Sequence, residues 1–163
     1  MESITLCGYV HIPGTRSRYV FNAVAGDPTA PGPFVETIQA GAFRQALRYR
    51  LRPDVRLTVD HGRVIGSVKG GELKLEEDER GLKAIALIRD PAVIRSAADS
   101  ELRGWSFGYT PLASKWERLG DNLYRRTVTR LLLHEVTLAV CNLPAYPGTA
   151  IELVEVQNGY SGA

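Results

Sequence analysis

Cysteines and long apolar runs are both scarce in this sequence. Cys7 and Cys141 are its only cysteines, too few for a disulfide framework and without the spacing of metal ligands. No run approaches the ~20 apolar residues of a membrane helix. The N-terminus also lacks the basic and then apolar regions of a secretory signal. We therefore expect free thiols, no membrane association and a reducing cytoplasm.

An excess of either charge sign is also missing. The 20 basic and 18 acidic residues give a formal net charge of +2, whereas a nucleic-acid-binding protein usually has a basic face. The richest basic stretch, Arg44 to Arg56, carries apolar residues at helix-like intervals. We interpret it as a solvated helix face and expect no nucleic-acid partner.

Glycine and proline interrupt the chain at short intervals, as they do in β-rich domains. The length of 163 residues fits one domain, placed at residues 1–156, with a flexible C-terminal tail at residues 157–163. Helices are expected over residues 36–52 and 91–102, and strands over residues 4–12, 19–24, 55–59, 64–69, 73–76, 82–88, 105–109, 115–119, 123–129 and 131–140. The predicted fold is mostly β with peripheral helices (α+β), as a closed, mostly antiparallel barrel.

One serine, Ser106, lies two residues from a glycine on each side. Residues 104–108, Gly-Trp-Ser-Phe-Gly, match the G-x-S-x-G nucleophile elbow of α/β-hydrolases, which needs a strand before the serine and a helix after it. Here the expected helix precedes Ser106, and Pro111 blocks one after it. Ser106 fits either a nucleophile on another scaffold, with glycines that free backbone N–H groups for an oxyanion, or a small strand residue between packed aromatics.

His61 is the candidate base for Ser106. A serine hydroxyl is a poor nucleophile unless an adjacent base takes its proton, and imidazole suits that role near neutral pH. His61 follows a predicted strand and precedes a turn at Gly62, a position that a surface histidine would fit equally well. Asp60 would point to the opposite face of an extended strand, so it is not expected to orient His61.

His134 and Glu135 are the candidates for a third group that holds the imidazole in the correct tautomer. Adjacent strand residues face opposite sides, so at most one of them reaches His61. His134 shares the more apolar face and is expected to point into the core. A carboxylate among uncharged neighbours needs a partner, which favours Glu135, with His134 as the alternative.

Two other chemistries are not expected. Asp60, His61, His134 and Glu135 lack the spacing of a metal site, and Cys141 has no sign of an activated thiol. We therefore expect neither a metal nor another cofactor.

Several segments, in their order and spacing, resemble the prohead proteases of tailed bacteriophages, serine peptidases of capsid maturation, from about residue 8 to 149. The segments are Tyr19–Asn22, Glu36–Phe43, Val59–His61 with Ile65–Gly66, Asp78–Leu82, Ser106–Tyr109, Glu135–Val140 and Pro144–Pro147. The family pattern carries its catalytic histidine at His61, its serine at Ser106 and a glutamate at Glu135. Thr137 replaces a serine that is more usual in the family.

The resemblance implies the β-barrel fold of herpesvirus assemblins, whose triad uses a second histidine, which keeps His134 as an alternative. It also implies cleavage of the scaffolding segment of the major capsid protein, or of a separate scaffold, inside the procapsid in the host cytoplasm. Self-cleavage and, by analogy with assemblins, a homodimer are further expectations. A prophage or gene-transfer agent would encode the same kind of protein.

Two other functions fit the same residues. One is a catalytically inactive β-barrel that serves capsid assembly or is fused to the scaffold. The other is a small-molecule serine esterase with the same triad.

Overall fold

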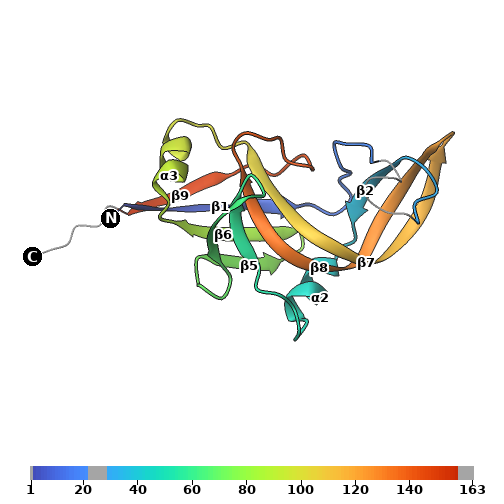
Figure 1. Cartoon of the computed structure of the whole chain (residues 1–163), viewed down its shortest axis with the longest axis horizontal. Helices are drawn as coiled ribbons and strands as arrows, with labels where there is room; N and C mark the ends of the chain where they lie inside the picture. Colours follow the sequence, from blue (N-terminus) through green and yellow to red (C-terminus); the bar gives the residue numbers. More distant parts are fainter. Residues whose placement is uncertain (1, 22–28, 158–163) are drawn as a thin grey trace, which may run out of the picture.

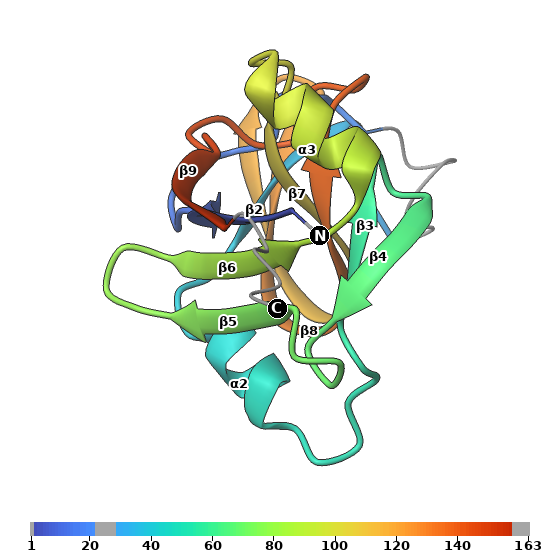
Figure 2. The same cartoon turned by 90° about the vertical axis from the view of Figure 1, so that its left-hand side faces the viewer.

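The structure is a computed structural model that describes residues 2–21 and 29–157. Its strands form two sheets, with helices α2 (Ala42–Arg48) and α3 (Pro91–Ala98) beside them (Figures 1 and 2). The prediction of a mostly β domain with peripheral helices is confirmed. No described helix has the length and apolar character needed to cross a membrane.

The first sheet is antiparallel, with the strand order β5-β6-β1-β9. Its strands are β1 (Ser3–His11), β5 (Leu73–Glu77), β6 (Leu82–Ile88) and β9 (Glu152–Gln157). Alternate residues of β6, from Leu82 to Ile88, are buried in the core, as expected for a strand with one face against a core.

The second sheet is built around a long hairpin of β7 (Gly104–Gly120) and β8 (Leu123–Ala139), which extends to one end of the molecule (Figure 1). β7 occupies one edge of β8. On the other edge, β2 (Phe34–Ile38) pairs in parallel with one part of β8 and β3 (Arg56–Val59) with another, and β4 (Arg63–Ser67) pairs with β3. Because β2 and β3 share that edge, the intervening α2 lies beside the middle of β8.

The predicted closed barrel is wrong, whereas the predicted mostly antiparallel pairing is confirmed. Among the described residues the strands form two separate sheets, neither of which closes, and both β2 and β3 run parallel to β8. A period of two shows which side chains face the core, but it does not show which strand edges pair. The local sequence therefore gives no basis for predicting barrel closure or the parallel pairing of β2 and β3 with β8.

The helix predicted over residues 36–52 is also partly wrong, because its first residues belong to β2 and α2 covers only Ala42–Arg48. Gly41, at φ 91°, separates the two elements. Each of the two hairpin strands was predicted as two short strands. In the structure each is continuous, and register shifts on either side of Pro111 accommodate that residue in β7, as β-bulges do.

Two predictions near the ends of elements have different outcomes. Asp90 caps α3, as predicted, because its carboxylate accepts a hydrogen bond from the Val93 N–H at 3.0 Å. Gln157 was assigned to the tail, but it pairs with Ser3 as the last residue of β9, an unpredicted strand. Half of the expected strand over residues 19–24 lies outside the described residues, and its described half contributes one bridge, from Phe21 to Phe34.

The core orients the segment that carries the candidate nucleophile. Trp105 and Phe107 are both buried in the hydrophobic core. Since successive strand residues point to opposite faces, Ser106 faces away from the core. Val136 and Leu138 of β8 have the same inward orientation, so Glu135 and Thr137 share the outer face with Ser106.

Candidate active site

A row of polar side chains crosses three strands on the outer face of the second sheet. Ser106 of β7 pairs with Thr137 of β8, which pairs with Thr58 of β3. One step along the sheet, Gly108 pairs with Glu135. Ser106, Thr58, Thr137 and Glu135 are all buried, and buried polar side chains usually have hydrogen-bond partners.

His61 reaches this row from a tight turn between β3 and β4. The Gly62 N–H donates to the Val59 carbonyl at 2.9 Å, while Asp60 and His61 have φ angles of 48° and 58°. Positive φ at both central residues is the pattern of a type I′ turn, in which Asn-Gly is the common pair. Left-handed backbone at two non-glycine residues is unfavourable. Such strain occurs at functional sites where the surroundings impose the conformation.

The Asp60 carboxylate anchors this turn to the end of β8. It accepts backbone hydrogen bonds from Val140 at 2.9 Å, Cys141 at 3.1 Å and Asn142 at 3.4 Å. Burial raises the pKa of Asp60, but these N–H groups outweigh it and hold the pKa below its usual range. Asp60 was not expected to orient His61 directly, and it instead fixes the backbone that carries it.

Glu135 is the direct partner of the His61 ring. His61 Nδ1 lies 2.6 Å from Glu135 Oε1, and the Thr58 hydroxyl donates to Oε2 at 2.9 Å. The His61 backbone N–H donates to Thr137 Oγ1 at 2.9 Å. With Nδ1 donating to the carboxylate, the neutral ring has its lone pair on Nε2. The His61 side chain remains 45% exposed, so this ring is open to a ligand.

The two glycines on either side of Ser106 leave room for neighbouring side chains. A Cβ atom at Gly108 would lie 2.8 Å from Glu135 Cγ and 2.9 Å from Oε1. At Gly104 it would lie 2.7 Å from both Pro144 Cγ and Thr149 Oγ1. Gly108 therefore permits the close approach of Glu135, a role in addition to the one inferred from the sequence.

Ser106 lies in the same row but is not hydrogen-bonded to His61. Within the described part of the chain its hydroxyl has no hydrogen-bond partner. The two residues are linked through Thr137, which is opposite Ser106 in the sheet and accepts the His61 N–H. The structure thus brings His61 and Glu135 into contact and places Ser106 on the neighbouring strand.

His134 is directed elsewhere. Its Nε2 lies 2.7 Å from Thr110 Oγ1 and the residue is half-buried, so the expectation of a core-facing histidine is wrong. The register shifts where residues 108–109 of β7 meet residues 133–135 of β8. Consequently Leu133 and Val136 both face the core, which breaks the strict alternation assumed for this strand.

The structure also adds three residues that the sequence did not assign to the site, namely Thr58, Asp60 and Thr137. Only Asp60 gave a signal, because aspartate at the end of a strand often binds nearby backbone N–H groups. The backbone N–H groups of Cys141 and Asn142 bind Asp60, so they are not free to bind an oxyanion. No described group of three or more His, Cys, Asp and Glu side chains is arranged to hold a metal ion.

Comparison with known proteins gives a family match over almost the whole chain. The model of the family described as Caudovirus prohead serine protease matches residues 2–160. Among solved structures, the varicella-zoster virus protease is similar, with a TM-score of 0.48 and 16% sequence identity. The alignment covers 93% of this chain but 64% of that protease, so the chain spans less than two thirds of its length. No curated protein sequence matches the chain.

Proposed function

The chain belongs to the caudovirus prohead serine protease family, and from this premise we propose that it is a serine endopeptidase of capsid maturation. Ser106 is the nucleophile, His61 the general base and Glu135 the third member of the triad. The contact of 2.6 Å between His61 Nδ1 and Glu135 Oε1 carries this assignment, because it orients the imidazole so that Nε2 can accept a proton.

The reaction is acyl transfer to Ser106. His61 Nε2 takes the hydroxyl proton as Oγ attacks the peptide carbonyl carbon, and the imidazolium then returns that proton to the leaving amine as the C–N bond breaks. Water, deprotonated in turn by His61, hydrolyses the ester and regenerates Ser106. Glu135 stabilises the imidazolium in both steps.

The first step requires Ser106 Oγ to come within about 2.6–3.2 Å of Nε2 when substrate binds, since catalytic hydrogen bonds are often long without substrate. For the oxyanion, the backbone amides near Gly108 remain the candidate donors, because those of Cys141 and Asn142 are engaged by Asp60.

The proposed substrate is the scaffolding segment of the major capsid protein, or a separate scaffold protein, inside the procapsid in the host cytoplasm. Family membership supports this choice. We also include cleavage of the chain itself and a homodimeric active form in the proposal.

Co-expression with the neighbouring capsid protein tests the function. Intact-mass spectrometry should show a shortened capsid protein with wild-type chain and full-length capsid protein with Ser106→Ala. Ser114→Ala, on the same strand, is the matched control and should behave as wild type. Equal masses with the wild type and Ser106→Ala would refute the proposal and favour a catalytically inactive assembly protein.

A second comparison tests the third member. Glu135→Gln should lower the cleavage rate more than His134→Ala, because only Glu135 contacts the His61 ring. The reverse ranking would remove Glu135 from the triad.

A further inference from the structure

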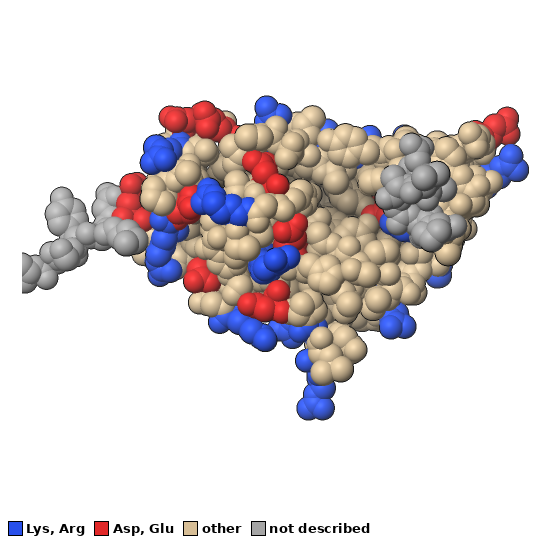
Figure 3. Space-filling model, viewed as in Figure 1, with Lys and Arg blue, Asp and Glu red and all other residues tan. Residues whose placement is uncertain are grey.

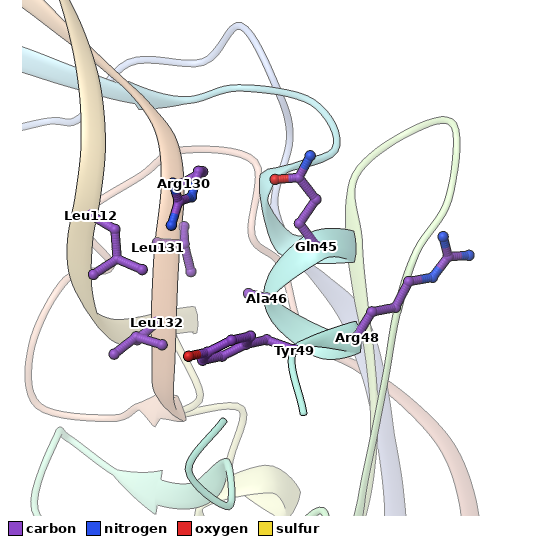
Figure 4. Close-up of a pocket in the computed structure, with 8 residues that line it drawn as sticks. All are labelled: Gln45, Ala46, Arg48, Tyr49, Leu112, Arg130, Leu131 and Leu132. Carbon is purple, nitrogen blue, oxygen red and sulfur yellow. The ribbon is translucent and has the colours of Figure 1, made fainter. Parts of the chain in front are cut away.

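A groove of about 470 Å³ lies between α2 and the β7–β8 hairpin (Figure 4). Its lining residues are Gln45, Ala46, Arg48, Tyr49, Leu112, Arg130, Leu131 and Leu132. In Figure 4 the Tyr49 ring extends from the end of α2 toward Leu132, with Leu112 on the neighbouring strand. Ser106, His61 and Glu135 are not among the lining residues, so the groove is separate from the proposed triad.

The groove follows an edge of β8 that has no strand partner. On that edge β2 pairs with β8 up to Val128, and β3 pairs with it from Glu135 onward. Between them, residues 129–134 have β7 on one side and no described strand on the other. Because α2 packs beside this stretch of β8, a peptide would reach the edge through the groove between the helix and the hairpin. An unpaired strand edge accepts an extended peptide through backbone hydrogen bonds, while neighbouring pockets select its side chains.

The groove also presents apolar side chains to solvent. Tyr49 and Leu112 are each 48% exposed, and Leu132 beside them is half-buried. Exposed apolar side chains gathered at one place, with polar residues around them, are typical of sites that bind another chain.

Arg130 supplies positive charge to the groove from β8, whereas Arg48 also lines a neighbouring pocket with Glu76 and Glu77. Arg48 and Arg130 are its only ionisable lining groups besides the Tyr49 phenol, and neither forms an ion pair with a described acid. Figure 4 shows Arg130 on β8 itself, whereas Arg48 extends away on the far side of α2. On the face in Figure 3 both signs are interspersed. The positive charge in the groove is therefore that of Arg130, and an acidic residue of a bound peptide complements it.

We propose that this groove binds an extended segment of a protein substrate in which acidic and apolar residues alternate. The identity of that partner as the substrate rests on the proposed function. Leu112 follows Ser106 by six positions on β7, or about 20 Å at the rise of an extended strand. The groove would therefore hold a segment well outside the scissile bond and raise the affinity for long substrates without touching the reacting atoms.

Binding is measured on the full chain carrying Ser106→Ala, so that the probe is not cleaved. The probe is a fluorescein-labelled peptide, Gly-Glu-Leu-Glu-Leu-Glu-Leu-Gly, followed by fluorescence anisotropy. Two matched peptides replace every Glu with Lys or every Leu with Ser. Binding is expected for the first peptide alone, and it should weaken with added salt.

Variants of the groove locate the binding. Arg130→Glu and Leu112→Ser should each weaken binding about tenfold, a change of about 1.4 kcal/mol. Arg95→Glu, an exposed arginine on α3, is the control and should leave binding unchanged. Thermal melting checks that each variant is folded. If Arg130→Glu does not fold, Arg130→Gln replaces it in the binding measurement.

Several outcomes would overturn the proposal. Equal binding of the Lys peptide would exclude charge selection. Binding of an oligothymidylate that Leu112→Ser leaves intact would indicate a polyanion site. Self-association in sedimentation that Leu112→Ser abolishes would assign the groove to a second copy of the chain.

A kinetic comparison separates this proposal from the proposed function. On the wild-type background, Arg130→Glu should raise KM for the capsid protein with kcat unchanged, and it should not affect a short peptide that ends before the groove. An equal effect on both substrates would refute the groove as a substrate site. Cleavage that persists in Ser106→Ala would refute the function while leaving the binding result intact.

Discussion

His11 should make the stability of this protein fall as the pH drops below neutral. The residue is fully buried, and neither ring nitrogen has a hydrogen-bond partner among the described residues. It packs against the rings of Phe43, Phe107 and Tyr146, with centroid distances of 5.7, 5.9 and 4.7 Å. Burial lowers the pKa of His11 from 6.5 to about 4, because an apolar surrounding disfavours the charged ring.

The lowered pKa of His11 determines how the free energy of unfolding changes with pH. Above pH 6.5 the ring is neutral in both the folded and the unfolded chain. Between pH 6.5 and about 4 the unfolded chain binds a proton that the folded chain does not, so the free energy of unfolding decreases as pH falls. At 1.36 kcal/mol per pH unit, the total loss is about 3 kcal/mol.

Urea unfolding of the wild type and His11→Leu at pH 7 and pH 4 measures this loss. Other groups titrate in both proteins, so the change in the difference between them isolates His11. The wild type should lose about 3 kcal/mol more than His11→Leu between the two pH values. His134→Gln, at a half-buried histidine, is the control and should retain the loss. If the difference in unfolding free energy between the wild type and His11→Leu were the same at both pH values, the reasoning would be refuted.

Two further predictions concern the support of Glu135. Thr58→Val should lower the free energy of unfolding by about 1.5–3 kcal/mol, because it removes a hydrogen bond to a buried carboxylate. Urea unfolding should show a smaller loss of unfolding free energy for Thr58→Ser, which keeps the hydroxyl. If Thr58→Val lowered the free energy of unfolding as much in a Glu135→Gln background as in the wild type, the account would be contradicted. Gly108→Ala should cost about 1–3 kcal/mol through its contact with Glu135 and reduce cleavage. Gly120→Ala, where a Cβ meets no atom within 4 Å, should change neither the free energy of unfolding nor the cleavage rate. Equal effects of Gly120→Ala and Gly108→Ala would argue against crowding at Gly108.

Local features of the fold were predictable from the sequence. The strand over residues 82–88 has the predicted bounds, because it is a short, mostly apolar run that directly follows the turn at residues 79–81. The start of α3 was predictable for a similar reason, since Asp90 followed by Pro91 places both a cap and a first helical residue.

Features that depend on distant strands were not predictable. The apolar residues after Glu36 fit a helix equally well, and only pairing with β8 makes them part of β2. The bulge near Glu135 changes which residues face the core, and no local pattern indicates it. The positive φ of His61 depends on Asp60 binding the end of β8, a contact between segments far apart in sequence.

The candidate site was predictable in its residue types more than in its contacts. Because neighbouring strand residues point to opposite faces, only one of His134 and Glu135 was expected to reach His61. In the structure Glu135 contacts the His61 ring. The two threonines that support this pair gave no sequence signal, because threonine is common in any strand. Their role depends on register, which places Thr58 and Thr137 opposite each other.

Labelling with a fluorophosphonate tests most directly whether the pair of His61 and Glu135 activates Ser106. Peptide mass spectrometry should find the adduct on Ser106 of the wild-type chain and none on Ser114. His61→Ala should slow the labelling by about 10²–10⁴-fold, the usual contribution of a general base. An unmodified Ser106, or labelling at the same rate in His61→Ala, would contradict the account.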